Sequence, residues 1–121
     1  MASNQPVSIY GIKACDTMKK ARDWLDAADV AYAFHDYKIQ GIDAGTLGVW
    51  AGVVGWEKLL NRAGTTFRKL PDPDKTDIDQ AKAIGLMVAQ PSMIKRPVLA
   101  VGGALIVGFS PEAYRQAFAA P

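Results

Sequence analysis

The sequence predicts an α/β fold in which a helical segment interrupts a mixed four-stranded sheet. Three observations support it: residues 7–37 have the pattern strand–helix–strand, residues 97–118 have the pattern strand–strand–helix, and the segment between them has the apolar spacing of short helices. Half of the 121 residues are hydrophobic, which is enough for a core. We therefore expect a single domain over residues 1–121.

The first strand and helix follow from local patterns. Residues 7–10 alternate as a strand does, and Gly11 allows a tight exit. A helix over residues 16–28 is predicted, with Asp16 or Thr17 as its N-cap. Its apolar face repeats at three and four residues, at Met18, Ala21, Leu25 and Ala28.

A second strand is expected over residues 30–37, after Asp29 ends the helix. A strand–helix–strand unit normally places its two strands parallel with a right-handed crossover. Residues 41–92 are predicted to be a helical insertion. It contains short helices at 47–50 and 56–60, and a further helix that begins at Thr76 with Asp79 as its capping-box partner.

The last part of the chain predicts a β-hairpin and a helix. Strands are expected at residues 97–101 and 104–107, joined by a glycine pair at 102–103 that is typical of a two-residue hairpin turn. Ser110 caps the final helix, with Pro111 in the first-turn position that suits proline. The order βαβ, helices and then ββα matches a thioredoxin-like fold with an inserted helical segment.

Cys15, the only cysteine, stands where the first strand passes into the first helix. A thiol there faces unpaired backbone N–H groups and the positive end of the helix dipole, and both favour the thiolate. Lys13, Lys19 and Lys20 add positive charge. The alternative is a buried structural cysteine, because free cysteine is among the most buried residue types.

The residue three positions after Cys15 is Met18, where a CxxC motif carries its second cysteine. No disulfide can form within one chain, so a redox cycle needs an external thiol. Glutathione, or a glutaredoxin that uses it, is the expected electron donor. A chain without disulfides is also typical of the reducing cytoplasm.

Two basic segments are candidates for binding an anion. Arg96 precedes Pro97, and this pair marks either an ordinary strand boundary or a cis peptide that sets the guanidinium beside the thiol. Asn61 and Arg62 begin a second basic stretch, which is either a solvated helix end or a set of anion donors. His35 is expected to be a packing residue rather than a catalytic base.

Other classes of function lack a signal. A net charge of +2 is too small to indicate nucleic-acid binding, and residues 1–6 do not have the pattern of a secretory leader. No apolar run is long enough for a membrane span, and no Cys/His cluster or glycine-rich nucleotide loop is present. We expect a cytoplasmic monomer without a bound metal or cofactor.

Five segments together resemble the arsenate reductase-like family, which includes arsenate reductases, Spx regulators and YffB-type proteins. They are residues 10–21, 34–37, 60–66, 94–99 and 108–110. The YffB-type branch is the most similar. The resemblance implies a thioredoxin-like fold with a helical insert, Cys15 as nucleophile, a cis peptide before Pro97, and glutathione as co-substrate.

The resemblance also implies a site for the substrate. In the arsenate reductases three arginines hold the oxyanion, and Arg96 matches one of them. Asn61 stands near the second position with Arg62 beside it, and Gly108 stands near the third. Arg62 or Arg68 are candidates to replace the missing arginines. The remaining substrate or glutathione contacts are expected from Lys13, Thr17 and Pro97.

Three functions follow as hypotheses. The first is a glutathione-coupled oxidoreductase in which the Cys15 thiolate and Arg96 reduce arsenate or a glutathione mixed disulfide. The second is an Spx-like module that docks on RNA polymerase without a redox switch, because Met18 replaces the second cysteine. The third is a fold kept for an unrelated interaction, with an inert Cys15.

Overall fold

The structure is a computed structural model that describes residues 6–118. The expectation for the first residues, that they carry no leader, concerns residues that lie largely outside this range. The chain divides into two compact units, which we call unit 1 (Met1–Asp36 and Arg96–Pro121) and unit 2 (Tyr37–Lys95). The single domain with an insertion at 41–92 stays a prediction.

Unit 1 contains a four-stranded mixed sheet with the strand order β2-β1-β3-β4. The strands are β1 (Val7–Gly11), β2 (Ala33–Asp36), β3 (Val98–Val101) and β4 (Ala104–Val107). β1 pairs parallel with β2 and antiparallel with β3, which forms the predicted hairpin with β4. The thioredoxin-like α/β fold predicted from the sequence is confirmed.

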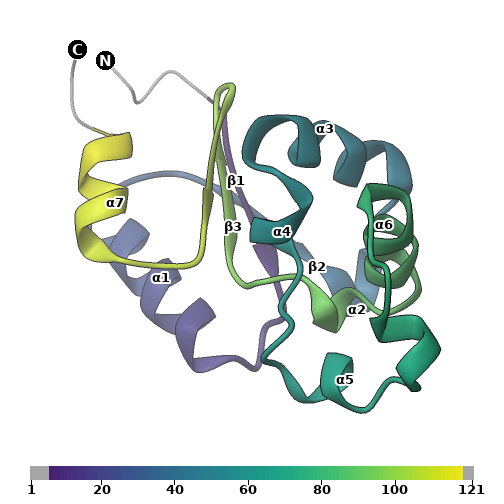
Figure 1. Ribbon diagram of the computed structural model, residues 1–121. Coiled ribbons are helices and arrows are strands. Elements are labelled where there is room, and N and C mark those ends of the chain that lie inside the picture. The colour runs from purple at the N-terminus through teal and green to yellow at the C-terminus, as the bar shows by residue number, and fades with distance from the viewer. Residues whose placement is uncertain (1–5, 119–121) are drawn as a thin grey trace. The chain divides into compact units, whose positions relative to one another are not determined.

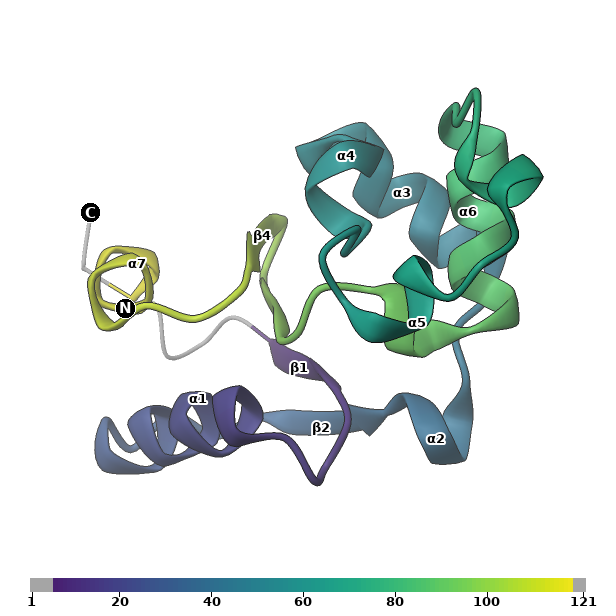
Figure 2. The ribbon, with the colours of Figure 1, turned by 60° about the horizontal axis from the view of Figure 1, so that its bottom comes forward.

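Two helices cover one face of this sheet, α1 (Asp16–Ala27) and α7 (Pro111–Ala117) (Figures 1 and 2). Ser110 caps α7 by accepting a 3.1 Å hydrogen bond from the N–H of Ala113, as predicted. The core between sheet and helices consists of buried apolar side chains from β1, α1, β3 and α7. They are Val7, Ile9, Met18, Ala21, Leu25, Leu99, Val101 and Tyr114.

The end of α1 corrects two predictions. Ala28, expected on the buried face, is exposed and lies at the C-cap. Asp29 follows with a φ of 58°, and the N–H of Val30 donates to the carbonyl of Leu25 over 3.0 Å. This is the Schellman arrangement, which turns the chain sharply out of a helix. β2 therefore begins only at Ala33 instead of residue 30.

Unit 2 is built of helices, as predicted, but two of its helices differ from the prediction. The elements are α2 (Tyr37–Gln40), α3 (Ala44–Val54), α4 (Trp56–Leu59), α5 (Thr65–Arg68), η2 (Asp72–Lys75), α6 (Gln80–Ala89) and η3 (Pro91–Met93). α3 starts earlier than residue 47 because Asp43 caps it, accepting from the N–H of Thr46 over 2.7 Å. Asp79 is itself the N-cap of α6, so the helix does not begin at Thr76.

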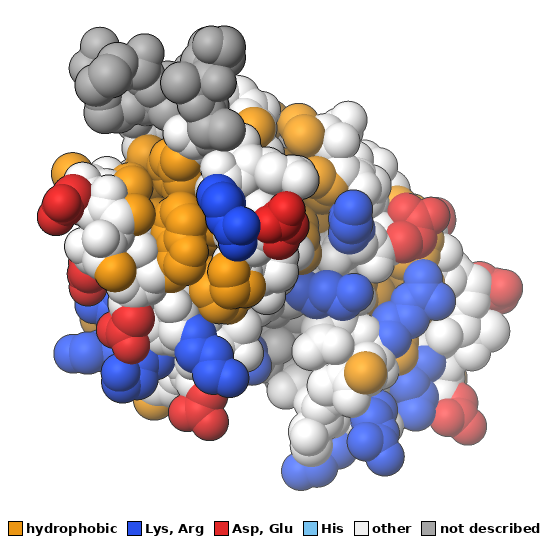
Figure 3. All heavy atoms as spheres, turned by 90° about the vertical axis from the view of Figure 1, so that its left-hand side faces the viewer, with side chains coloured by type: hydrophobic (Ala, Val, Ile, Leu, Met, Phe, Trp, Pro, Cys, Tyr) orange, Lys and Arg blue, Asp and Glu red, His pale blue; other side chains and the backbone are white. Residues whose placement is uncertain are grey.

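The surface carries both signs of charge. Figure 3 shows lysine and arginine side chains at the surface, with acidic side chains among them. Among residues 6–118 none of the helices has the length and apolar character that crossing a membrane requires. In the same range no group of three or more His, Cys, Asp or Glu side chains is arranged to hold a metal ion.

Candidate active site

Cys15 is the N-cap residue of α1, with an extended backbone at φ −140° and ψ 128°. The prediction that Asp16 or Thr17 caps this helix is wrong, because the chain enters helical geometry one residue earlier, at Asp16 itself. Cys15 is partly exposed to solvent. An N-cap side chain is directed at the first unpaired N–H groups of the helix, so the sulfur lies among backbone donors.

The surroundings of the sulfur favour the thiolate. Burial raises the pKa of the Cys15 thiol, but four opposing contributions outweigh it, and the pKa lies below its ordinary value. They are the backbone N–H of Met18, a hydrogen bond from Arg96, the backbone N–H of Thr17, and the charge of Arg96. The two N–H contacts fall short of full capping hydrogen bonds. They therefore act on the sulfur mainly as oriented dipoles.

Arg96 reaches Cys15 because of the strand register. Tyr10 of β1 pairs with Val98 of β3 in antiparallel register, so the residues before β3 lie beside the loop that follows β1. The Arg96–Pro97 peptide bond is cis, as predicted. Pro97 is buried, and its carbonyl accepts a 2.8 Å hydrogen bond from the N–H of Gly108.

The same hydrogen bond locates the third position of the expected arginine set. Gly108 is next to the Arg96–Pro97 segment, and its φ of +84° is one that side chains other than glycine adopt rarely. This position therefore offers backbone but no side chain to an anion. Of the three arginines implied by the resemblance, Arg96 is present and close to the sulfur.

The lysines near Cys15 were expected to add positive charge that favours its thiolate. The positive charge that lowers the pKa of Cys15 is that of Arg96, not of Lys13, Lys19 or Lys20. All three lysines are exposed, where solvent screens their charge. Lys19 is in addition paired with Asp23 over 2.8 Å.

Asn61 and Arg62 belong to unit 2, between α4 and α5. The backbone N–H of Asn61 donates to the carbonyl of Met93 over 2.8 Å. The guanidinium carbon of Arg62 lies 5.2 Å from the centre of the Trp56 ring, in cation–π contact. Their role in binding the substrate, like that of Arg68 at the end of α5, stays a prediction.

The imidazole of His35 lies 4.9 Å from the ring centre of Tyr10 on the neighbouring strand. This cross-strand ring pair agrees with the expected packing role of His35. Thr17 lies in the first turn of α1 and is half-buried, and it acts on the sulfur through its backbone N–H.

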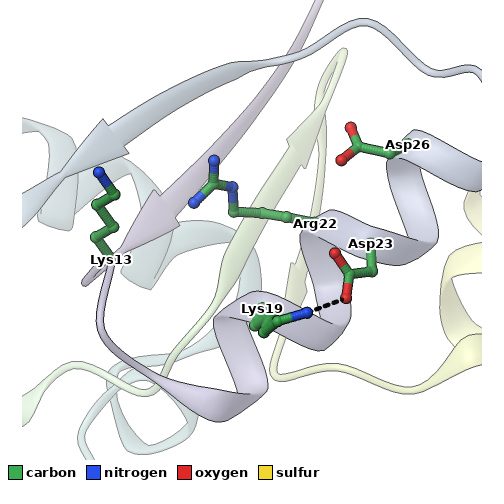
Figure 4. Close-up of a pocket in the computed structure, with 5 residues that line it drawn as sticks. All are labelled: Lys13, Lys19, Arg22, Asp23 and Asp26. Atoms are coloured by element: carbon green, nitrogen blue, oxygen red, sulfur yellow. Dashed lines mark hydrogen bonds and ion pairs between the residues drawn. The ribbon is translucent and has the colours of Figure 1, made fainter.

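One feature was missed by the sequence reasoning: a pocket of about 300 Å³ beside α1 (Figure 4). Its lining is entirely charged and consists of Lys13, Lys19, Arg22, Asp23 and Asp26. The spacing of the four α1 residues indicates a shared helix face. The orientation of Arg22, however, depends on a contact with β2 that the sequence pattern does not contain.

Known proteins resemble this chain over most of its length. The profile of the ArsC family matches residues 10–117. A solved YffB protein is 64% identical, covers 93% of this chain and 99% of its own, and has a TM-score of 0.91. An arsenate reductase (ArsC) related protein from Brucella melitensis is 57% identical, with coverages of 93% and 94% and a TM-score of 0.75. An uncharacterized protein from Haemophilus influenzae is 36% identical over 113 residues, which are 93% of this chain and 99% of that protein.

Proposed function

The chain belongs to the ArsC family, and we propose that it is a glutathione-dependent thiol oxidoreductase that works through one cysteine. The family supports the coarser statement, an arsenate reductase-like thiol oxidoreductase. The single-cysteine mechanism and the coupling to glutathione are the parts that we add. Such a reaction belongs in a reducing compartment, which we take to be the cytoplasm.

One observation carries the proposal: Arg96 and the first N–H groups of α1 converge on Cys15 and lower its pKa. A thiolate is the nucleophilic form of cysteine, so these groups prepare the side chain for attack. They also face the negative charge that develops on an oxyanion or on a sulfur leaving group. Met18 is fully buried and carries no thiol, so the adduct on Cys15 must be resolved from outside.

The proposed cycle has two thiol–disulfide exchanges. In the first, the Cys15 thiolate attacks the glutathione sulfur of a mixed disulfide. A Cys15–glutathione disulfide forms, the original disulfide breaks, and the substrate leaves as a thiolate that takes a proton from water. In the second, a glutathione thiolate attacks the sulfur of that adduct. Oxidised glutathione is released, and the Cys15 thiolate is restored.

Arsenate is the second substrate in this proposal, and we expect it to be the poorer one. A mixed disulfide requires only the activated sulfur and Arg96, whereas the oxyanion is expected to need three arginines. Gly108 supplies none, and Asn61 stands where the other would be. A glutaredoxin is a further candidate to resolve the adduct.

The test measures glutathione-dependent reduction of a small mixed disulfide by the wild type and by Cys15→Ser. We expect turnover in the wild type and none above background in the variant, because serine cannot form the adduct. Equal rates for both proteins in mixed-disulfide and arsenate assays would rule the proposal out. The Spx-like docking role stays a prediction, tested by a pull-down with the polymerase α subunit against a thioredoxin control.

A further inference from the structure

The pocket beside α1 is lined mainly by one face of the helix that Cys15 caps. Lys19, Arg22 and Asp26 follow Cys15 at intervals of four, seven and eleven residues, which is the repeat of one face of an α-helix. Lys13 completes the lining from the loop that leads into the helix. A volume of about 300 Å³ is at the lower end of the range for ligand pockets.

Arg22 is held in place by β2 and by the segment before it. Its Nε donates a 3.3 Å hydrogen bond to the hydroxyl of Tyr32, and its guanidinium carbon lies 4.7 Å from the ring centre of Phe34. These contacts use one N–H group and one face of the guanidinium. The N–H groups of its two terminal nitrogens make no hydrogen bond or ion pair within the described residues, and their planar arrangement can bind a carboxylate at two points.

The direction of Arg22 is unusual for its position. Asp26 stands four residues after it, where a helical ion pair is normally favourable. Figure 4 shows Arg22 instead extending toward Lys13 and away from Asp26. Among residues 6–118 no side-chain ion pair involves Arg22, Lys13 or Asp26. Two cations at the same end of a pocket, with no anion between them, repel each other, so the arrangement is suited to receiving one.

Charges in the pocket define what it can bind. Lys19 and Asp23 neutralise each other, since their 2.8 Å hydrogen bond also raises the pKa of Lys19. Two cations, Lys13 and Arg22, then remain at one end, which we call the basic end. One carboxylate, Asp26, remains at the other. The complementary ligand carries two carboxylates and one ammonium group.

We infer that this pocket is a binding subsite for the peptide part of the thiol co-substrate. Glutathione carries two carboxylates and one ammonium at neutral pH, which matches the pocket charge for charge. The glycine carboxylate would bind Lys13. The γ-glutamyl residue carries its carboxylate and its ammonium on one carbon, so it would place the carboxylate on Arg22 and the ammonium on Asp26. This inference rests on the proposed function, because the reacting sulfur of the same peptide must meet Cys15.

The distances along the helix are compatible with one ligand that reaches both places. Arg22 follows Cys15 by seven residues, which corresponds to about 10 Å along the axis. The reacting sulfur of glutathione is on its middle residue, so a terminal carboxylate lies about 7 Å from it, and the length of the Arg22 side chain covers the difference. The guanidinium is directed back toward the loop that carries Lys13, which shortens the span further.

The first test measures binding without chemistry. S-methylglutathione, which cannot react, is titrated into the ¹⁵N-labelled protein while the amide shifts of residues 13–26 are followed. We expect saturable shifts in the wild type and a dissociation constant about tenfold higher in Arg22→Gln. Arg115→Gln is the matched control, because Arg115 lies on α7 in an exposed ion pair with Glu112. An unchanged dissociation constant in Arg22→Gln, or no saturable shift in the wild type, would overturn the inference.

A second variant tests whether a loss of affinity in Arg22→Gln is due to altered structure rather than to the lost positive charge. Lys13 is exposed and makes no side-chain hydrogen bond within the described part of the chain, so Lys13→Gln should leave the fold intact. We expect it also to weaken binding several-fold. Folding of every variant is checked by its melting temperature. If a folded Lys13→Gln bound S-methylglutathione with wild-type affinity, Lys13 would not contribute to the binding site.

The acidic partner is tested by changing the ligand. Acetylation of the ammonium of S-methylglutathione should weaken binding to the wild type but hardly affect binding to Asp26→Asn, because the group it would pair with is already gone. Glu112→Gln serves as the surface control. An equal loss in wild type and Asp26→Asn would show that Asp26 does not bind the ammonium.

These measurements separate two kinds of failure. If the wild type binds S-methylglutathione through Arg22 and Asp26 but shows no Cys15-dependent turnover, the subsite stands and the proposed function fails. If turnover depends on Cys15 and yet Arg22→Gln leaves both affinity and the KM for glutathione unchanged, the function stands and the subsite is wrong.

Discussion

The thioether of Met18 lies directly against the α-carbon of Gly11, so that a Cβ at position 11 would overlap its sulfur. Gly11 ends β1 and Met18 is fully buried in the first turn of α1. This close approach joins the strand to the helix on either side of the loop that carries Cys15. A side chain at position 11 would therefore disturb the strand and helix that flank the loop carrying the reactive sulfur.

Gly11→Ala is expected to destabilise the protein by about 1–3 kcal/mol, because the added methyl group forces a packed side chain to move. Urea unfolding measures the loss. Gly48→Ala is the matched control, since nothing lies within 4 Å of the added Cβ in the interior of α3. We expect that control to be neutral or to stabilise by up to about 1 kcal/mol. An equal effect at both positions would contradict the packing argument.

Loss of the α7 cap gives a second prediction. Ser110→Ala removes the side-chain oxygen that accepts from the N–H of Ala113, and it should cost about 1 kcal/mol of unfolding free energy. Ser110→Asp keeps an acceptor at the same place and should remain close to the wild type. Thermal or urea unfolding of the two variants decides the matter. If both lose the same stability, the hydrogen bond is not the cause.

Tyr114 anchors α7 in the core, and its hydroxyl has no hydrogen-bond partner among the described residues. Burial raises the pKa of this phenol, as expected for a group shielded from water. Removing an unpaired buried hydroxyl relieves its desolvation cost, so Tyr114→Phe should be neutral or stabilise by about 1 kcal/mol. A loss of more than about 1 kcal/mol in urea unfolding would mean that the hydroxyl has a partner in solution.

Much of unit 1 could be predicted because its signals are local. Alternation defines β1, the glycine pair defines the hairpin, and Ser110 with Pro111 marks the start of α7. Cys15 could be placed near a helix N-terminus for the same reason. The N-cap itself could not, because Asp16 and Thr17 have higher cap preference and only the backbone path makes Cys15 the cap.

Other features depend on contacts between distant parts of the chain. The short helix expected at 47–50 is part of the longer α3, because burial of Leu47 and Trp50 in unit 2 outweighs the low helix propensity of its glycines. No local sequence pattern indicates the orientation of Arg22. Its contacts with Tyr32 and Phe34 exist only because β2 returns beside β1, and the pocket depends on them.

The lowered pKa of Cys15 predicts how its reactivity changes with pH. Thiolate accumulates as pH rises through that pKa, so iodoacetamide alkylation should reach half its maximum rate at a lower pH than for a free thiol. Arg96→Gln removes a hydrogen bond and a charge that favour the thiolate, so its midpoint should move up, while Arg115→Gln leaves the midpoint in place. By linkage, the folded state gains stability from this group above the unfolded pKa and loses it as pH falls through the folded one. If Arg96→Gln keeps the wild-type midpoint, Arg96 does not hold the charge of the thiolate.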